Sequence, residues 1–406
     1  MPAAIVADVT TEPARRTVDA IVVGLGGIGS AAAWHLAASP GSPRVLGLEQ
    51  FELGHDRGAS QDQSRITRLS YHRPEYVQLA IEAQSAWREV EAAAGRRVLT
   101  MTGGLDLAPP NAAESIDDYA DSMTAAGVAF EWLDGVEVAR RWPAWRLQPG
   151  TRAIFQADAG IADPEQGNAA HQALARQAGA ELLEHARVVA IADHGGELEV
   201  TLDDGQAFTT GSVVICADAW TNDLLGPLGK TLPLTVTREQ VTWFEPEDAA
   251  AFAPERFPIW IWLDQPSFYG FPAHGGRGPK VGQDVGGRAT TATTRTFDLD
   301  IDCLDRVETF LGRHLPGAGP RASTKTCLYT LTPDRDFVLD RMPEQPGIVV
   351  ALGAAHGYKF AALFGRLLAD LALDPARRPP AFGHDLFTLG RPALVALPES
   401  NLVANA

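Results

Sequence analysis

The sequence predicts an α/β fold made of two interleaved domains, and three observations support this prediction. The chain of 406 residues is longer than one ordinary hydrophobic core requires. A strand, a glycine-rich turn and a helix follow one another near the N-terminus, and another apolar strand and helix follow near the C-terminus. Between these ends, residues 236–325 are rich in aromatic and β-branched residues, which favours a sheet.

The first strand and helix are expected close to the N-terminus. Residues 18–23 form a short apolar run, and an alanine-rich helix over residues 30–38 follows its glycine turn. A second strand is expected at residues 44–48. Residues 77–94 carry apolar side chains near helical spacing, which predicts a helix. This order is typical of a nucleotide-binding fold.

Later segments continue the alternation of strands and helices. The chain mixes strand-like and helical pieces over residues 97–155. Further elements are expected as a helix at 162–178, a hairpin around Asp204-Gly205, a strand at 212–217, a strand at 348–353, and a helix whose apolar stripe over 360–371 belongs to the core. The two ends of the chain therefore form one domain, and the middle forms a second.

Gly24, Gly26 and Gly29 form a GxGxxG fingerprint between the first strand and helix. In this motif the first glycine permits a tight turn, the second lets the backbone approach a pyrophosphate, and the third lets helix and strand pack closely. Glu49 ends the second strand at the spacing expected for an acid that binds a ribose hydroxyl. We therefore predict a bound dinucleotide rather than a purely structural turn. The fingerprint does not separate NAD from FAD.

Composition and charge exclude several classes of protein. The formal net charge of −17 and the lack of a basic stripe argue against a nucleic-acid partner. We find no apolar stretch long enough to span a membrane, and we interpret residues 1–17 as a loose leader. Cys216, Cys303 and Cys327 are too few and too far apart for a disulfide framework or a CxxC metal site. We interpret Cys216 and Cys303 as structural, and reduced thiols favour a cytoplasmic protein.

Several segments, taken in order, indicate a family. They are GASQDQSRITR at 58–68, YGFP at 269–272 with GPKVG at 278–282, TCLYTLTPD at 326–334, and GAAHGYKF at 353–360. Together they resemble the monomeric sarcosine oxidase and N-methyltryptophan oxidase family, within the D-amino-acid-oxidase-like flavoproteins. The resemblance covers residues 18–373. It implies a Rossmann-like domain that binds FAD and a mostly antiparallel sheet that covers the flavin and forms the substrate pocket.

The resemblance also implies roles for individual residues. Cys327 is expected to bond the flavin 8α-methyl carbon, and Lys280 to lie beside the flavin where oxygen is reduced. Arg68 and Lys359 are expected to hold a substrate carboxylate. The other implied site residues are Arg65 over the flavin ring, the pocket tyrosines Tyr269 and Tyr329, and, with Gly24, Gly26, Gly29 and Glu49, the cofactor-binding residues Ser60, Val188, Gly353, Gly357 and Lys359.

Three positions depart from the family pattern. Gln61 stands where a histidine is common, and Asp284 stands where another pocket histidine is expected. We assign Gln61 to substrate binding and Asp284 to catalysis. A carboxylate in place of an imidazole changes the charge and shape of the pocket, so the identity of the substrate stays open. Asp218 replaces a glycine that usually follows the strand at 212–217.

These candidate residues also have ordinary structural explanations. A free cysteine such as Cys327 is usually a small buried hydrophobe, and Lys280 fits a solvated loop lysine. Arg65 and Arg68 are three residues apart and fit a solvated helical face. Lys359 fits a lysine that reaches to the surface from an apolar helix. The resemblance favours the functional role in each case.

We therefore predict an FAD-dependent oxidase of a secondary amine or N-methyl amino acid. It would oxidise the C–N bond to an imine, pass the electrons to O2 and release hydrogen peroxide. The alternatives are a dehydrogenase that passes electrons to a quinone or partner protein, a biosynthetic oxidase of a cyclic imine or amine, an NAD-dependent dehydrogenase, and a non-catalytic binding protein. We expect no metal and favour a monomer.

The predicted domains are discontinuous in the chain. Their expected limits are residues 18–96, 155–235 and 326–390 for the FAD-binding domain, and residues 97–154 and 236–325 for the substrate domain.

Overall fold

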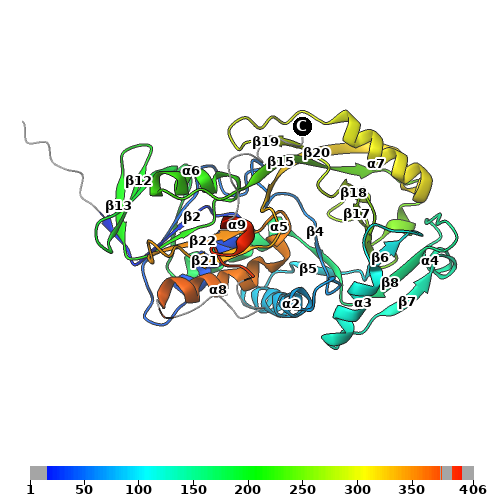
Figure 1. The fold of residues 1–406 in the computed structure, drawn as a ribbon, viewed down its shortest axis with the longest axis horizontal. Helices are drawn as coiled ribbons and strands as arrows, with labels where there is room; N and C mark the ends of the chain where they lie inside the picture. The colour runs from blue at the N-terminus through cyan, green and yellow to red at the C-terminus, as the bar shows by residue number, and fades with distance from the viewer. Residues whose placement is uncertain (1–15, 375, 377–385, 396–406) are drawn as a thin grey trace, which may run out of the picture.

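The computed structural model describes residues 16–374, 376 and 386–395. Residues 1–15 of the predicted leader and residues 375 and 377–385 of the predicted FAD-binding domain lie outside this range. Arg16 and Thr17, which we assigned to the leader, instead form strand β1 (Arg16–Thr17), which pairs in parallel with β13. Figure 1 shows the described elements gathered into two bodies that meet near the middle of the molecule.

A mostly parallel sheet lies at the centre of the first body. Its strands follow the order β10–β3–β2–β14–β22–β21, and only the last pair is antiparallel. The strands predicted at 18–23, 44–48, 212–217 and 348–353 are confirmed as β2, β3, β14 and β22. The strand bounds are β2 Ala20–Val23, β3 Val45–Leu48, β10 Glu181–Leu183, β14 Val213–Ile215, β21 Val338–Arg341 and β22 Ile348–Leu352.

Side-chain alternation along β2 separates two hydrophobic cores. Ala20 and Val22 pack against helices, whereas Ile21 and Val23 pack against a smaller sheet, because successive side chains of a strand point to opposite faces. The helices are α1 Gly27–Ala37, α2 Pro74–Ala94, α5 Pro164–Gln177 and α8 Ala361–Leu373. The smaller sheet joins β1 to β13 Ala207–Thr210, β12 Leu198–Leu202 and β11 Val188–Asp193, with α6 Thr221–Leu225 nearby. The hairpin predicted around residues 204–205 is confirmed between β12 and β13.

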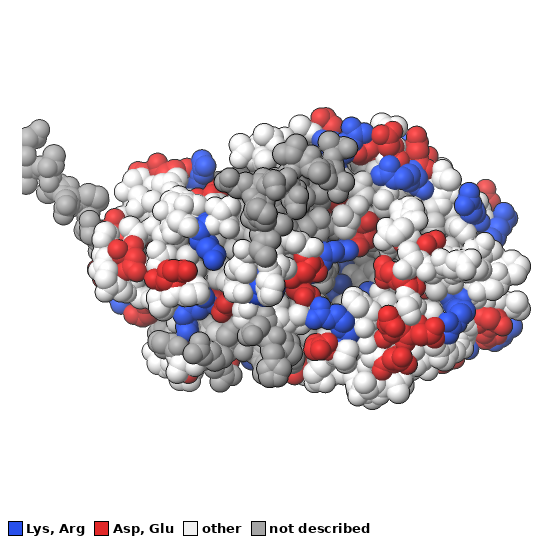
Figure 2. Space-filling model, viewed as in Figure 1, with Lys and Arg blue, Asp and Glu red and all other residues white. Residues whose placement is uncertain are grey.

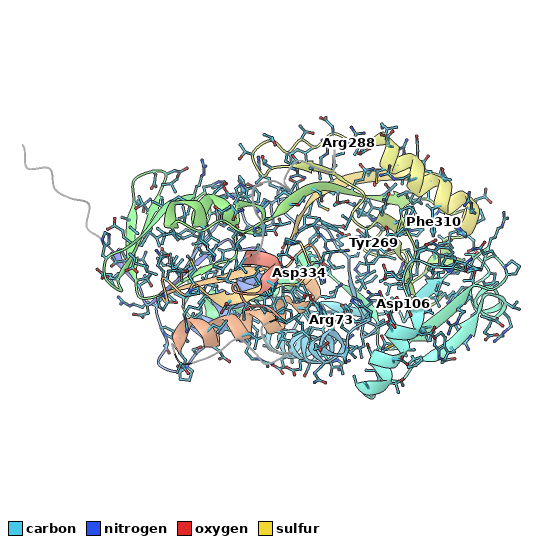
Figure 3. All side chains as sticks on the ribbon, viewed as in Figure 1. Arg73, Asp106, Tyr269, Arg288, Phe310 and Asp334 are labelled. Atoms are coloured by element: carbon cyan, nitrogen blue, oxygen red, sulfur yellow. The ribbon has the colours of Figure 1, made fainter. Side chains whose placement is uncertain are left out.

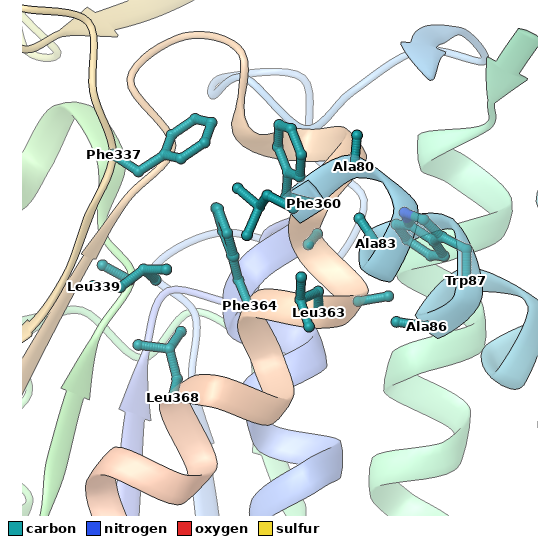
Figure 4. Packing of buried hydrophobic residues seen from close by; sticks show 14 of the residues in the cluster. Ala80, Ala83, Ala86, Trp87, Phe337, Leu339, Phe360, Leu363, Phe364 and Leu368 are labelled. Carbon is teal, nitrogen blue, oxygen red and sulfur yellow. The ribbon is translucent and has the colours of Figure 1, made fainter. Parts of the chain in front are cut away.

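The core on the helix side contains the apolar stripe predicted at residues 360–371. Figure 4 shows Phe360 and Phe364 beside Phe337, with Trp87 of α2 close by. The rings of Phe360 and Phe364 stack with centroids 5.6 Å apart, and Phe337 meets Phe364 edge-on at 5.0 Å. Each fully buried side chain of this size contributes about 1.5–3 kcal/mol of hydrophobic stabilisation. The stripe is therefore core, as predicted.

A large, mostly antiparallel sheet forms the second body. Its order is β19–β15–β18–β17–β16–β6–β8–β7, with β20 on the other side of β15, and β16 pairs with β6 in parallel. The bounds are β6 Gly104–Ala108, β7 Glu131–Asp134, β8 Arg152–Gln156, β15 Thr235–Phe244, β16 Ile259–Trp262, β17 Phe268–Phe271, β18 Lys280–Gln283, β19 Arg288–Thr290 and β20 Arg321–Leu331. Helices α3 Ile116–Ala125 and α4 Gly135–Arg141 also belong to this body, and α9 Pro392–Val395 lies near the parallel sheet.

One helix in this region corrects our sequence interpretation. We read residues 236–325 as a sheet, but residues 301–314 form α7 (Ile301–His314). Asp300 caps the helix by accepting a hydrogen bond from the Cys303 amide, and the buried apolar residues recur at helical spacing. Phe310 of α7 packs on Trp260 and Trp262. These tryptophans are therefore core residues.

Two strands of the large sheet cross the predicted domain limits. The limit at 154/155 falls inside β8, and the limit at 325/326 falls inside β20, although both strands pair within the large sheet. A three-stranded sheet, β4 Arg65–Thr67, β9 Gly160–Ala162 and β5 Leu99–Met101, lies near the junction. The domain limits themselves stay predictions.

Candidate active site

A cavity of about 740 Å³ lies where the parallel sheet meets the large sheet. The carboxyl ends of β2, β3, β14 and β22 supply one wall, and β17, β18 and β20 supply another. Ligands of open α/β sheets bind at the carboxyl ends of the strands. The cavity therefore joins the predicted nucleotide site to the predicted substrate wall.

The glycine turn has the geometry that the fingerprint requires. Gly24 adopts φ +90°, and a side chain there would place Cβ 2.5 Å from the Cys216 carbonyl oxygen. At Gly29 a Cβ would lie 1.8 Å from the Gly24 carbonyl oxygen, so only glycine lets α1 pack on this turn. Ser60 Oγ accepts a hydrogen bond of 3.0 Å from the Gly27 amide. Gly24 and Gly26 line the cavity, whereas Gly29 lies behind it.

Glu49 is fixed at the end of β3 by backbone donors. Its Oε2 accepts a 2.9 Å bond from the Leu25 amide, and its Oε1 accepts a 3.2 Å bond from the Phe51 amide. The carboxylate is buried and lines the cavity, as the predicted ribose ligand must. The other predicted cofactor-binding residues Ser60, Val188, Gly353 and Gly357 also line it.

Two buried acceptors in the cavity wall fit a ligand that carries hydroxyl groups. Asp218 Oδ2 and Gln61 Oε1 are buried without a hydrogen-bond partner among the described residues. Asp218 replaces the usual glycine but keeps a glycine-like φ of +45°. Burial raises the pKa of its carboxyl to about 6. Because unsatisfied buried acceptors are costly, these groups and the close-approach glycines together fit FAD.

The wall expected to face the flavin contains Cys327 and a tyrosine pair. Cys327 lies on β20 and lines the cavity, and burial raises the pKa of its thiol to about 11. Gln61 Nε2 donates a 2.8 Å hydrogen bond to the carbonyl oxygen of Thr326, the residue before this cysteine. The hydroxyls of Tyr269 and Tyr329 lie 3.3 Å apart. Gln61 therefore supports the β20 backbone.

Lys280 is a buried cation with fixed partners. Its Nζ donates to Asp62 Oδ2 at 2.7 Å and to the Ser64 carbonyl oxygen at 2.8 Å. Burial lowers the pKa of Lys280 to about 8, and the Asp62 charge opposes this shift. Arg65 is held nearby by the backbone carbonyls of residues 59, 61 and 64. Neither residue is a solvated surface cation.

Arg68 has a partner that the sequence analysis missed. Its Nη1 donates a 2.8 Å hydrogen bond to Oδ1 of Asp106, a buried residue of β6. Its Nε is buried and has no hydrogen-bond partner in the part of the chain that the structure describes. Figure 3 labels Asp106 among the strands of the large sheet. The sequence did contain a signal for this partner. An aspartate stands within the apolar run GLDLA, and a buried carboxylate needs a cationic partner.

Asp284 and Lys359 complete this part of the cavity. Asp284 accepts two hydrogen bonds from Arg335, at 2.8 and 3.2 Å, rather than pairing with Arg68 or Lys359. The Lys359 ammonium has no carboxylate partner among the described residues. Burial and the Arg68 charge lower the pKa of Lys359 to about 7. Unlike Arg68 and Lys280, Lys359 can thus take a ligand's carboxylate without breaking an ion pair among the described residues.

The glycine fingerprint and the substrate wall of one cavity define an oxidoreductase that works with a bound dinucleotide. The family model described as FAD dependent oxidoreductase matches residues 19–371. The chain belongs to this family and, within it, to the monomeric sarcosine oxidase and N-methyltryptophan oxidase family. The fold and the resemblance that the sequence predicted are confirmed. FAD is the cofactor, and the enzyme acts on CH–NH donors with oxygen as acceptor.

Relatives cover almost the whole chain. Monomeric sarcosine oxidase of Streptomyces avermitilis is 37% identical over 375 residues, which are 90% of this chain and 96% of the relative. N-methyl-L-tryptophan oxidase of Yersinia pestis is 29% identical, over 92% of this chain and 99% of the relative. The solved structure of NikD, an unusual amino acid oxidase essential for nikkomycin biosynthesis, is 30% identical with a TM-score of 0.81, over 89% of this chain and 95% of that one.

Two further findings concern partners. No helix in the described part of the chain is long and apolar enough to cross a membrane. Figure 2 shows acidic and basic side chains intermixed on the face in view, so the excess of acidic residues does not gather there into one patch. The predicted cytoplasmic location and monomeric state stay predictions.

Proposed function

We propose that this protein oxidises a secondary amine or N-methyl amino acid to an imine and releases hydrogen peroxide. The observation that carries the proposal is the single cavity that connects the glycine fingerprint to the unpaired ammonium of Lys359. A carboxylate held at Lys359 places the amine of an amino acid against the wall that contains Tyr269 and Tyr329. Bound FAD supplies the redox chemistry, by accepting two electrons and delivering them to oxygen.

The residues of the chain would bind, orient and neutralise charge. Gly24, Gly26 and Glu49 hold the nucleotide part of the cofactor, and Cys327 attaches the flavin. Lys359 and the free edge of Arg68 hold the substrate carboxylate. Asp106 keeps Arg68 in place, and its negative charge offsets the positive charge of Arg68. Arg68 and Lys359 therefore repel each other less strongly.

The test of the proposed function is an anaerobic screen of N-methyl and cyclic secondary amino acids. A substrate should bleach the visible absorbance of the enzyme, and admitted air should restore it with one equivalent of peroxide. Restored colour without peroxide would contradict the oxidase proposal. Bleaching that only a quinone reverses would favour the dehydrogenase alternative.

The likeness to NikD favours a second candidate, a biosynthetic oxidase that acts on a cyclic amine or imine. NikD is 30% identical to this chain, which is the same identity as that of several of the sarcosine oxidases. The acidic residues Asp106 and Asp284 beside the predicted substrate site also suit a substrate other than sarcosine. The screen separates the candidates, since cyclic amino acids should then bleach the enzyme much faster than sarcosine.

Binding of a carboxylate at Lys359 should depend on pH. The ammonium is charged below its pKa of about 7 and neutral above it, so affinity for a carboxylate such as pentanoate should fall by about tenfold per pH unit at higher pH. Flavin absorbance titrations from pH 6 to 9 measure this change. Lys359→Arg keeps the charge throughout this range and should flatten the profile. A profile unchanged by this substitution would point to another group, such as Lys280.

A further inference from the structure

Asp284 and Arg335 form a bidentate ion pair that connects the two bodies at the cavity. Asp284 follows β18 of the large sheet, and Arg335 lies in the loop between β20 and β21, which leads into the parallel sheet. Both residues line the cavity, and their side chains are 29% and 41% exposed. A ligand in the cavity can therefore contact either charge.

The backbone presents this pair in a strained geometry. Arg335 adopts φ +59° and Val285, next to Asp284, adopts φ +51°, although neither is glycine. The Arg335 amide donates to the Thr332 carbonyl oxygen at 3.1 Å, and the Arg335 carbonyl oxygen accepts from His356 Nε2 at 2.8 Å. Residues held in such conformations by their surroundings are concentrated at functional sites.

The pair also lies close to the groups expected around the substrate. The charges of Asp284 and Arg335 act on the pKa of Lys359 in opposite directions, and Asp284 raises the pKa values of Tyr269 and Tyr329. Arg68, Lys280 and Arg335 each already have a carboxylate partner. Among the cations near this pair, Lys359 differs from Arg68, Lys280 and Arg335 in having no carboxylate partner among the described residues, so it can take a ligand carboxylate without breaking an ion pair.

We propose that the Asp284–Arg335 pair is a charge filter, which restricts the substrate to amino acids with one carboxylate and an uncharged side chain. This inference rests on the proposed function and names its substrate class. A second carboxylate would have to displace Asp284 from a bidentate arginine, and a second cation would have to displace Arg335 from Asp284. In the intact pair each charge cancels the attraction that the other would exert.

Removing one partner should reverse this selection in a predictable direction. Asp284→Asn frees Arg335 and should improve binding of a ligand with a second carboxylate. Arg335→Gln frees Asp284 and should improve binding of a ligand with a second cation. Each gain corresponds to about one charge-assisted hydrogen bond, which is roughly 10- to 150-fold in relative affinity.

Three ligands of similar length, without an oxidisable amine, provide the test: pentanoate, glutarate and 4-guanidinobutanoate. Their dissociation constants are measured with the FAD-loaded enzyme through changes in its visible spectrum. The wild type should prefer pentanoate. Asp284→Asn should shift the ratio toward glutarate, and Arg335→Gln should shift it toward 4-guanidinobutanoate. The double variant should return to pentanoate.

Matched measurements separate the possible failures. Asp117→Asn breaks an exposed pair with Arg152 outside the cavity and should leave all three ratios at wild-type values. Unchanged ratios in both single cavity variants, with pentanoate binding intact, would overturn the charge filter alone. If the wild type binds no pentanoate, or if Lys359→Met does not weaken that binding, the carboxylate site fails and the proposed function with it.

Discussion

Replacing Lys280 by methionine is expected to slow the reaction with oxygen about 100- to 1000-fold, with little effect on oxidation of the amine. Methionine keeps the length of the side chain and removes its charge. In the native cavity that charge is buried and fixed by Asp62 and the Ser64 carbonyl oxygen. A preorganised cation stabilises the negative charge that oxygen acquires with its first electron. Stopped-flow absorbance measures the two half-reactions separately.

Lys359→Met is the matched control for this prediction. It removes a second lysine from the same cavity, but one without the Asp62 contact, and it should impair substrate capture rather than the oxygen reaction. The pH profile gives an independent check. The Lys280 charge is present below its pKa of about 8 and lost above it, so the oxygen reaction should slow as pH rises past 8. Equal losses in both half-reactions of Lys280→Met would indicate a structural role.

Local sequence patterns were sufficient to predict the nucleotide-binding elements. The fingerprint at Gly24, Gly26 and Gly29 depends on a turn, a strand and a helix that are adjacent in the chain, so its consequences were visible in one segment. The helical spacing of the apolar residues in 360–371 likewise predicts directly that this face of the helix is buried. Helix α7 was missed because aromatic and β-branched residues elsewhere in 236–325 dominated the interpretation of that region.

The partners of the charged site residues were beyond local patterns. Lys280 and Asp62 are 218 residues apart, Arg335 and Asp284 are 51 apart, and Arg68 and Asp106 are 38 apart. Whether two such charges meet depends on how the large sheet packs against the parallel sheet, which no spacing rule specifies. The sequence therefore indicated the cations, whereas their neutralisation by carboxylates came from the tertiary structure.

That neutralisation changes how the carboxylate site is understood. Arg68 and Lys359 were expected to hold a substrate carboxylate together, but Asp106 already occupies one edge of Arg68. We therefore expect Lys359 to contribute more than Arg68 to the capture of an anion, and its lowered pKa to make this capture sensitive to pH near neutrality.

The other large effect concerns Cys327, to which we expect the flavin to be covalently bound. After denaturation in acid and ultrafiltration, the yellow colour of wild-type enzyme should stay entirely with the protein. Cys327→Ala should release all of its FAD, since the fingerprint then holds it by reversible contacts alone. Cys216→Ala is the matched control, because Cys216 is half-buried like Cys327, lines the same cavity and is expected to be structural. It should retain the colour as the wild type does.

The rate of covalent attachment should reveal the chemistry of this thiol. The thiolate is the reactive form, and burial raises the pKa of Cys327 to about 11. At pH 7 the thiolate is therefore scarce, and its fraction grows by about tenfold per pH unit up to the pKa. When protein prepared without flavin is mixed with FAD, the rate at which acid-stable colour appears should rise accordingly between pH 7 and 9. Arg65, Lys280 and Arg295 favour the thiolate electrostatically. The Lys280 ammonium is charged only below its pKa of about 8, so Lys280→Met should slow attachment further below pH 8 and have less effect at pH 9. Acid-soluble colour from fully loaded wild-type enzyme would contradict the covalent bond, and an attachment rate independent of pH would show that ionisation of Cys327 does not limit its formation.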